Sequence, residues 1–528
     1  MAKIGLKRIR VFVALIAFIS LFLTFLGIQA GGISHVSNFF LHLQLLPALL
    51  KFTVSFSLIA IISFLCILLL NFVFGRFYCS TICPLGVLQD LIWRTGSLFR
   101  KKKSRRFNYQ PSSKRILRYG LLLVTLIFWI SGSLFLINLL DPYSSFGKIS
   151  VAIFRPAFIW LNNQLAFILE NFNVFSVAPI DLKWLPANVL IVSVALFLLI
   201  VVLSLWRGRL FCNTLCPAGA LMGIFAEKSL FRIYFNEAAC NQCRKCERKC
   251  KAECIDPVSK TIDPGRCVLC FNCLDSCDRD GIKYGLVRKS KEVVVSEETH
   301  DIGKRSFLLS LGAAMVSLPL LGKKSFSQNN QHPGFVPTAS DNPVTPPGSQ
   351  SYEHFTSACV ACYLCVSACP THVIVPSFFD YGLKGFMQPK LDYHASFCNF
   401  ECTRCGEVCP TSAILPLALE QKKTTQIGIA HFMPESCVVV VNGTDCGACS
   451  EHCPTKAVEM VPYGSLRIPK VNPDICIGCG ACEYACPTSP YKAIYVESNV
   501  GHKTALRLET LPADEEKPKD GATEEFPF

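Results

Sequence analysis

Residues 359–370 read Cys-Val-Ala-Cys-Tyr-Leu-Cys-Val-Ser-Ala-Cys-Pro, which places four cysteines in the pattern C-x2-C-x2-C-x3-C. This spacing is typical of a loop that binds a [4Fe–4S] cluster, because closely spaced thiolates can bind three corners of one iron–sulfur cube. The pattern occurs four times in the chain, at Cys240, Cys243, Cys246, Cys250; at Cys267, Cys270, Cys273, Cys277; at Cys359, Cys362, Cys365, Cys369; and at Cys476, Cys479, Cys482, Cys486.

Two looser versions of the motif bring the number of predicted cluster ligands to about 24, enough for about six clusters. They have a widened first gap and occur at Cys398, Cys402, Cys405, Cys409 and at Cys437, Cys446, Cys449, Cys453. The fourth cysteine of such a motif usually binds the neighbouring cube, so we expect the motifs to work in pairs. A zinc ribbon needs two C-x2-C pairs per metal and no run of four cysteines, so this spacing disfavours zinc.

The composition predicts a membrane protein. Hydrophobic residues make up 51% of the chain, and the mean hydropathy is +0.38. Apolar stretches of membrane-helix length lie near Val11–Leu26, Phe52–Phe74, Tyr119–Leu140 and Ala187–Trp206. Lys and Arg gather before the first stretch, between the second and third, and after the fourth, which predicts that these segments are cytoplasmic. The net charge of +14 could also suit nucleic acid, but no base-reading motif accompanies it.

A shorter cysteine motif, C-x3-C-P, occurs twice. Residues 75–86 read Gly-Arg-Phe-Tyr-Cys-Ser-Thr-Ile-Cys-Pro-Leu-Gly, and residues 208–219 read Gly-Arg-Leu-Phe-Cys-Asn-Thr-Leu-Cys-Pro-Ala-Gly. Both copies follow an even-numbered span, which predicts two repeated helix pairs with both motifs on the cytoplasmic face. Three interpretations stay open: a structural end of a span, a redox-active dithiol, or, if the two copies meet, a further four-thiolate cluster site made by Cys79, Cys83, Cys212 and Cys216.

The expected fold class is a membrane α-helical bundle of four spans, with room for a fifth, plus two α+β bacterial-ferredoxin-like modules. Residues 304–321 have a basic start and an apolar run, which resembles a twin-arginine export signal with Lys304 in place of the first arginine. This segment is either a fifth span or an interfacial or buried helix. The expected domains are the membrane domain (1–235), a cytoplasmic two-cluster module (236–290), the signal-like or fifth helix (303–322), a linker (323–350), a four-cluster domain (351–508) and a disordered tail (509–528).

At these motifs the chain resembles a fusion of the NapH and NapG accessory ferredoxins of periplasmic nitrate reduction. Residues 1 to about 290 are similar to the NapH type, which has four spans, two C-x3-C-P motifs and two cytoplasmic ferredoxin motifs. The part from about Gly303 is similar to the NapG/MauM type, which has four four-iron motifs, one with a widened first gap as at Cys437–Cys446. The NosR and CcoG polyferredoxins share the membrane motifs more distantly.

The resemblance implies electron exchange between the (mena)quinone pool and a partner oxidoreductase, at the bacterial inner membrane, with the four-cluster domain in the periplasm. The sequence shows no nucleotide loop and no nucleophile–base pair, so we expect no catalytic residues and assign the chemistry to partners. The rival interpretation is an assembly or maturation factor that reduces metal or thiols for another enzyme. A redox sensor is disfavoured, because a sensor needs one labile cluster rather than six.

Overall fold

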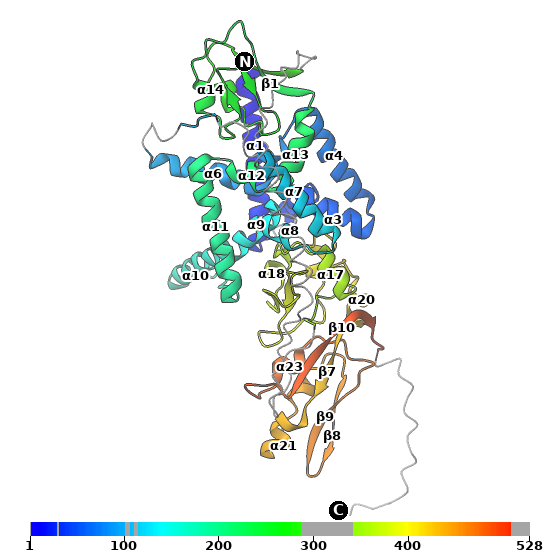
Figure 1. The fold of residues 1–528 in the computed structure, drawn as a ribbon. Helices are drawn as coiled ribbons and strands as arrows, with labels where there is room; N and C mark the ends of the chain where they lie inside the picture. Colours follow the sequence, from blue (N-terminus) through cyan, green and yellow to red (C-terminus); the bar gives the residue numbers. More distant parts are fainter. Residues whose placement is uncertain (1, 29–30, 101–105, 110–114, 287–341, 508–528) are drawn as a thin grey trace, which may run out of the picture. The chain divides into compact units, whose positions relative to one another are not determined.

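The computed structural model describes residues 2–28, 31–100, 106–109, 115–286 and 342–507. These residues belong to one compact unit, and Figure 1 traces their helices and strands. The signal-like segment 303–322, the first part of the linker and the tail 509–528 lie outside the described residues.

The described residues up to Glu227 are mostly helical, as their apolar composition predicts. The helices are α1 (Ala2–Leu26), α2 (Gly31–His42), α3 (Leu45–Ser55), α4 (Leu58–Phe74), α5 (Tyr78–Thr81), α6 (Pro84–Leu98), α7 (Arg115–Ile130), α8 (Phe135–Leu140), α9 (Pro142–Ile149), the π-helical turn η2 (Ser150–Phe154), α10 (Arg155–Asn171), α11 (Ala187–Arg207), α12 (Leu210–Thr214) and α13 (Pro217–Glu227).

Three helices of the described chain are long and apolar enough to cross a membrane: Gly5–Leu26, Pro142–Asn171 and Ala187–Arg207. The first and the last coincide with the spans expected at Val11–Leu26 and Ala187–Trp206. Of two shorter apolar helices, α4 lies within the second expected span, Phe52–Phe74, whereas α3 begins before it at Leu45. The apolar character of the N-terminal half is therefore confirmed, although its division into helices differs from the expectation.

The four uninterrupted spans expected from hydropathy are not what the structure shows. The second is divided at Phe56, whose φ of 47° ends α3 before α4 begins. The third ends at Ile130, because Gly132 has a φ of 80° and turns the chain before α8. Such left-handed residues cannot continue a right-handed helix.

Residues 142–171, expected as part of an outer-side loop, instead form the continuous run α9–η2–α10. The Asp141 carboxylate accepts a hydrogen bond from the Ser144 N–H at 2.8 Å, and Pro142 occupies the first turn. Both features favour a helix start. Hydropathy missed this helix because its mean hydropathy, 1.2, is far below the 3.0 of α11.

The first ferredoxin-like module begins with β1 and ends with β4, which pair in antiparallel orientation with Phe231 opposite Leu286. Its elements are β1 (Phe231–Phe235), α14 (Lys245–Arg248), β2 (Ile255–Asp256), β3 (Thr261–Ile262), α15 (Asn272–Asp275) and β4 (Ile282–Leu286). Each short helix carries the third cysteine of a motif, Cys246 in α14 and Cys273 in α15. The expected α+β composition of this module is thus present.

The C-terminal domain repeats this architecture with two-stranded antiparallel sheets, which pair β5 with β6, β7 with β10 and β8 with β9. Its elements are α17 (Tyr352–Ala358), α18 (Leu364–Ala368), β5 (Ile374–Pro376), β6 (Pro389–Leu391), α19 (Arg404–Glu407), α20 (Leu419–Thr424), β7 (Thr425–Phe432), η3 (Pro434–Ser436), α21 (Val438–Asn442), α22 (Ala448–Glu451), β8 (Val458–Tyr463), β9 (Leu466–Val471), α23 (Ala481–Ala485) and β10 (Ile494–Thr504).

The domain starts earlier than expected. Residues 342–350 were assigned to a flexible linker, yet Val344 and Ser349 are buried. The N–H of Leu391 donates to the carbonyl oxygen of Val344 at 3.0 Å. The end of the Pro-rich segment is therefore part of the folded domain.

Helix α1 contacts both ferredoxin-like parts, one near each of its ends. The Lys7 ammonium lies 2.6 Å from the Asp275 carboxylate of α15. At the other end, a Cβ on Gly27 would lie 3.3 Å from the carbonyl oxygen of Ser367 in α18. At about 1.5 Å per residue, the two contact points are roughly 30 Å apart along the helix. This distance matches the thickness of a bilayer's hydrocarbon core.

Candidate iron–sulfur sites

The four regular cysteine motifs share an unusual backbone conformation. In every copy, the residue just before the second cysteine and the residue just after it both have positive φ. These residues are Gln242 and Arg244, Leu269 and Phe271, Ala361 and Tyr363, and Gly478 and Gly480. Left-handed residues other than glycine are uncommon and strained. Turns of this kind aim successive backbone N–H groups into one concavity, which suits an anion.

The two looser motifs lack this feature. In the second gap, Thr403 has a φ of −118° and Gly447 a φ of −131°. The widened first gap gives the chain extra residues with which to turn, so these loops reach their third cysteine without the left-handed pair. The looser spacing in the sequence therefore corresponds to a different loop conformation.

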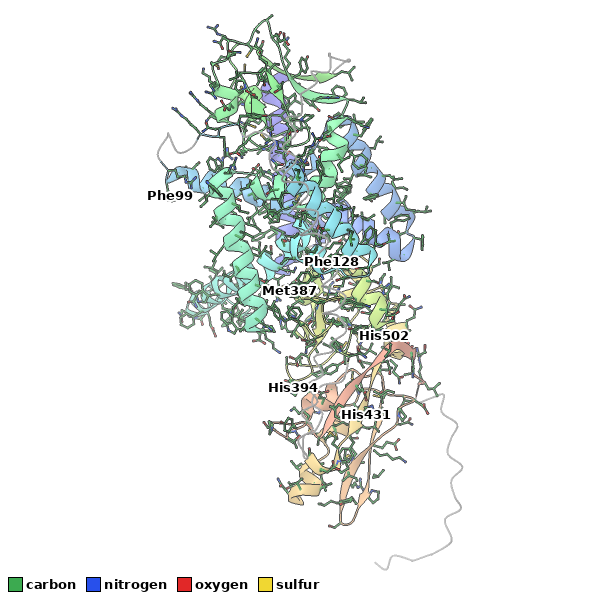
Figure 2. All side chains as sticks on the ribbon, viewed as in Figure 1. Phe99, Phe128, Met387, His394, His431 and His502 are labelled. Atoms are coloured by element: carbon green, nitrogen blue, oxygen red, sulfur yellow. The ribbon has the colours of Figure 1, made fainter. Side chains whose placement is uncertain are left out.

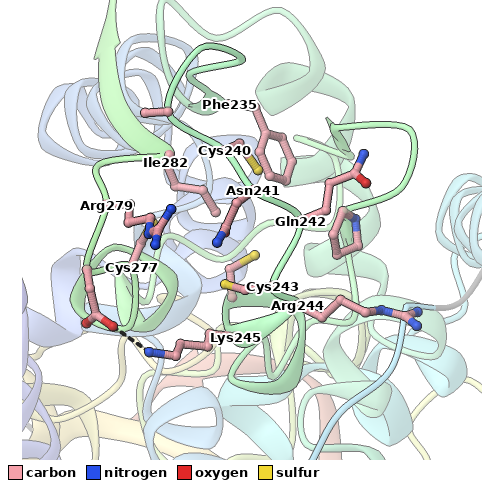
Figure 3. Close-up of a pocket in the computed structure, with 15 residues that line it drawn as sticks. Phe235, Cys240, Asn241, Gln242, Cys243, Arg244, Lys245, Cys277, Arg279 and Ile282 are labelled. Atoms are coloured by element: carbon pink, nitrogen blue, oxygen red, sulfur yellow. Dashed lines mark hydrogen bonds and ion pairs between the residues drawn. The ribbon is translucent and has the colours of Figure 1, made fainter.

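A cavity in the first module shows which cysteines belong together. It is lined by the first three cysteines of one motif and by the fourth of the other: Cys240, Cys243, Cys246 and Cys277. Figure 3 shows Cys240, Cys243 and Cys277 around this hollow, with the Lys245–Asp278 ion pair at its edge. This exchange of the fourth ligand is what the motif spacing predicted for paired clusters.

Two cavities in the C-terminal domain show the same exchange. One is lined by Cys437, Cys446, Cys449 and Cys486, and the other by Cys369, Cys398, Cys402 and Cys405. The motif at Cys359 is therefore paired with that at Cys398, and the motif at Cys437 with that at Cys476. The sequence alone did not reveal this pairing.

The three remaining sets follow from the side chains that lie within electrostatic range of one another. Cys250 approaches Cys270 and Cys273. In the C-terminal domain, Cys409 approaches the three cysteines of the motif at Cys359. Likewise Cys453 approaches the three of the motif at Cys476. Together with Cys267, these residues complete six sets of four thiols from the predicted 24.

The two cluster pairs of the C-terminal domain are joined directly. The N–H of Cys398 donates a hydrogen bond to the carbonyl oxygen of Cys479 at 2.9 Å. Cys398 belongs to the set that Cys369 completes, and Cys479 belongs to the set that Cys453 completes. The four sets are therefore arranged in series, from the set of Cys359 through those of Cys398 and Cys479 to that of Cys446.

A threonine two residues after the fourth cysteine contacts its sulfur in all four C-terminal motifs. The Sγ–Oγ1 distances are 3.6 Å for Thr371, 3.7 Å for Thr411, 3.7 Å for Thr455 and 3.1 Å for Thr488. A hydroxyl that donates to a ligating sulfur tunes the potential of its cluster. No role was predicted for these threonines, although the repeated Cys-Pro-Thr triplet is a sequence signal that points to them.

The donor chemistry fits iron–sulfur clusters. Burial raises the pKa of the Cys398 thiol to about 11 and that of Cys479 to about 12. Such thiols stay protonated at neutral pH until a bound metal displaces the proton. Among the described residues, no three His, Cys, Asp or Glu side chains converge on a single metal ion. This is expected for cubes, in which each thiolate binds a different iron.

Two further groups of cysteines lie close to these sets. Cys254, for which the sequence predicted no role, is buried with its Sγ 3.6 Å from that of Cys250. The four C-x3-C-P cysteines, Cys79, Cys83, Cys212 and Cys216, are all buried as well. The structure brings these four together, as described below.

These loops and their exchanged fourth ligands are typical of ferredoxin-type iron–sulfur domains. A family model described as a 4Fe–4S dicluster domain matches residues 358–413 and 444–489. A second model, described as a 4Fe–4S binding domain, matches residues 56–106 and 189–235, which contain the two C-x3-C-P motifs. The prediction of ferredoxin-type domains is confirmed.

The relatives point to the same class. An uncharacterized protein of Methanocaldococcus jannaschii is 27% identical over 228 residues, 43% of this chain and 78% of the relative. The methylamine utilization ferredoxin-type protein MauM of Methylobacillus flagellatus is 32% identical over 150 residues, 27% of this chain and 63% of MauM. The ferredoxin-type protein NapF of Escherichia coli is 26% identical over 161 residues, 30% of this chain and 90% of NapF.

No solved structure gives a significant match. The family models show ferredoxin-type 4Fe–4S domains in this chain, and the relatives that it resembles are ferredoxin-type proteins and a putative electron transport protein, YccM of Escherichia coli. The expected likeness to MauM is confirmed, whereas the likeness of residues 1–290 to NapH, and the more distant likeness to NosR and CcoG, stay predictions.

Proposed function

We propose that this protein is anchored in the bacterial inner membrane and relays single electrons between the quinone pool and a partner oxidoreductase. When bound, each [4Fe–4S] cluster can accept and give up one electron. The observation that carries the proposal is the serial order of the C-terminal ligand sets, joined at the Cys398–Cys479 hydrogen bond. A series of this kind conducts over a distance, whereas an isolated cluster pair would serve only local exchange.

Helix α1 supports the membrane part of the proposal. Its apolar length separates the contact of Lys7 with the first module from the contact of Gly27 with the C-terminal domain by about the thickness of the hydrocarbon core. The basic residues near the N-terminus favour a cytoplasmic start. On this arrangement, the two-cluster module is cytoplasmic and the four-cluster domain is periplasmic.

The two ends of the relay suggest its partners. The (mena)quinone pool is proposed as the exchanging substrate because quinones dissolve in the bilayer that the apolar helices would occupy. The partner oxidoreductase or cytochrome is proposed to dock at the last set in the series, that of Cys446. Exposed Val441 in the neighbouring helix α21 offers apolar contact there.

The rival maturation function loses part of its motivation. It was suggested by the C-x3-C-P thiols, which would have to attack a disulfide or metal site of another protein. Thiol exchange requires an accessible thiolate. All four of these cysteines are buried, so they are poorly placed for exchange with a partner.

Reduction of the clusters in anaerobic membranes tests the proposal. A menaquinol analogue should reduce clusters of the C-terminal domain, followed by electron paramagnetic resonance. In a Cys398→Ser variant, the set of Cys359 should still be reduced while the two later sets respond only to dithionite. The matched control is Cys66→Ser, which changes an exposed cysteine of α4 outside every motif.

Failure of the quinol to reduce any cluster that dithionite reduces would instead favour the maturation function. The proposed sidedness has its own measurement, which is the accessibility of a tag placed after Leu506 in intact spheroplasts. Protection of that tag from outside would put all clusters in the cytoplasm and remove the transmembrane relay.

A further inference from the structure

The two C-x3-C-P motifs meet in the structure as a pseudo-symmetric pair. The arginine before each motif reaches across to the other copy. Arg76 donates to the carbonyl oxygen of Cys212 at 3.3 Å, and Arg209 donates to that of Cys79 at 2.6 Å. The glycines are equivalent too, since a Cβ on Gly86 or Gly219 would lie 2.3 Å from the same cysteine carbonyls, Cys79 and Cys212 respectively. The repeat in the sequence is therefore one composite site in space.

The four thiols of this site are all buried and lie near one another. Every pairing among Cys79, Cys83, Cys212 and Cys216 lies within electrostatic range, and each residue is at most 5% exposed. The Gly219 N–H donates to the Cys216 sulfur at 3.2 Å. The composite site thus combines four sulfur donors with a backbone N–H directed at a sulfur, which is the donor set of an iron–sulfur cluster held by four thiolates.

Buried positive charge provides a second, independent indication of an anionic occupant. The Arg76 side chain is 0% exposed, and it forms no ion pair with a carboxylate in the part of the chain that the structure describes. Its Nη2 lies 3.7 Å from the Cys79 sulfur, and its Nε has no hydrogen-bond partner there. The neighbouring Gln89 amide nitrogen is also buried without a partner. A buried unpaired cation is costly, and an anionic cluster would remove that cost.

We propose that Cys79, Cys83, Cys212 and Cys216 together bind one additional iron–sulfur cluster, shared between the two C-x3-C-P motifs. This inference rests on the proposed relay function and extends it. The matching 4Fe–4S binding model covers both motifs separately; the geometry assigns them a single cluster, with two ligands from each copy. Arg76 and Arg209 act as positioning residues that cross-link the copies. Arg76 also balances the cluster's negative charge, whereas Arg209 is held by an ion pair with Asp90 at 2.9 Å.

The shared site lies between the two sets of ferredoxin motifs. On one side, Arg76 donates to the carbonyl oxygen of Gly265 at 2.8 Å and Asn213 to that of Ala252 at 3.3 Å. Gly265 and Ala252 each lie two residues from a ligand of the first module, Cys267 and Cys250. The shared cluster would therefore be a direct neighbour of the set of Cys250.

On the other side, the path leads to the C-terminal domain. Tyr78 lies within electrostatic range of both Cys83 and Asp141, and Asp141 lies within range of Cys362. An electron passing this site would leave one cluster as its neighbour gains it, with no bond made or broken and no proton moved. The shared cluster would divide a crossing that is too long for one step.

Iron and acid-labile sulfide in the anaerobically purified full-length protein test this inference without any assay of electron transfer. Six four-iron clusters account for about 24 iron atoms per chain, whereas a shared four-iron cluster raises the content to about 28 and a two-iron cluster to about 26. A value of about 24 in fully loaded protein would overturn the inference. Mössbauer spectra distinguish the two cluster types.

A double variant, Cys79→Ser with Cys212→Ser, should lose only the additional iron, and Cys66→Ser should lose none. Unchanged iron in the double variant contradicts the proposal. If the double variant fails to fold, the iron content of the unmodified protein still shows whether the shared cluster is present. If the protein contains the additional iron but quinol reduces none of its clusters, the relay function alone is contradicted. If quinol reduces the clusters but the protein contains only about 24 iron atoms, the shared cluster alone is contradicted.

Discussion

The backbone N–H of Cys398 donates to the carbonyl oxygen of Cys479 at 2.9 Å, and this single bond joins two cluster pairs that are separate motifs in the sequence. Because each residue belongs to a different set of four thiols, the two sets are held in adjacent positions by main chain rather than by mobile side chains. The order of the series is therefore built into the backbone of the C-terminal domain.

The threonine contacts predict that a hydroxyl group influences the midpoint potential of the last cluster in this series. The Thr488 hydroxyl lies 3.1 Å from the Cys486 sulfur while its oxygen accepts the Ala493 N–H at 2.9 Å. With the oxygen so occupied, the hydroxyl hydrogen is free to donate to the sulfur and stabilise the reduced, more anionic cluster. Thr488→Val should lower the midpoint potential of that cluster by on the order of 50 mV, where 59 mV corresponds to a tenfold change for one electron.

A redox titration followed by electron paramagnetic resonance measures this shift. Thr411→Val is the matched control, because its Sγ–Oγ1 distance of 3.7 Å is longer and its shift should be smaller. Equal shifts in both variants would contradict the assignment of the effect to the hydrogen bond.

The strained cluster loops predict that a glycine can stabilise the protein. Gln242 is exposed and has a φ of 56° between two ligands. Gln242→Gly should raise stability by about 1 kcal/mol, because glycine has no Cβ to clash in this conformation. Thermal loss of the cluster absorbance measures the change. Asn241→Gly, one residue earlier and without positive φ, should instead destabilise, and stabilisation by both variants would argue against relief of strain.

The contact between helix α9 and the C-terminal domain should tolerate no added methyl group. A Cβ on Gly147 would lie 2.2 Å from the carbonyl oxygen of Cys362 and 2.8 Å from the Phe25 ring. Gly147→Ala should cost about 1–3 kcal/mol of stability, since the backbone must move to relieve the overlap. Limited proteolysis in detergent should then cut residues 342–507 more readily. Gly501→Ala has no heavy atom within 4 Å and should leave the digestion pattern unchanged.

Acid should loosen the start of the C-terminal domain through His502. This residue of β10 (Figure 2) bonds the Thr345 hydroxyl at 2.9 Å, and burial lowers its pKa from 6.5 to about 4. As the pH falls, the histidine of the unfolded state binds a proton before the buried His502 does. The contribution of neutral His502 to the free energy of unfolding is therefore complete above pH 6.5 and is lost as the pH falls through 4. At the acid end the loss should approach about 3 kcal/mol.

Unfolding midpoints between pH 7 and pH 4 check this expectation, with His502→Gln as the comparison. The glutamine variant should show a flatter dependence over this window. The buried Glu483 acts in the opposite direction, because burial raises its pKa to about 7 and favours the fold at lower pH. A wild-type slope that matches the His502→Gln slope would exclude the histidine as the source.

Much of the chemistry could be predicted from local spacing. The tight loop of each cysteine motif follows from residues a few positions apart, such as Cys359 and Cys362, whereas the exchange of fourth ligands was predicted only from the general behaviour of paired motifs. The same is true of the apolar helices α1 and α11. Hydropathy was less informative where one left-handed residue, as at Phe56 or Gly132, ends a helix inside an apolar stretch.

Local spacing along the chain predicts which three cysteines share one loop, because a tight loop is specified by the few bonds between those residues. The folded chain was needed to show that Cys409 completes the set of Cys359, that Cys398 lies beside Cys479 and that Cys79 lies near Cys212. These pairs are brought together by packing of buried surfaces from distant segments. Spacing along the chain carries no information about such contacts, because their distance in space is set by every element folded between them.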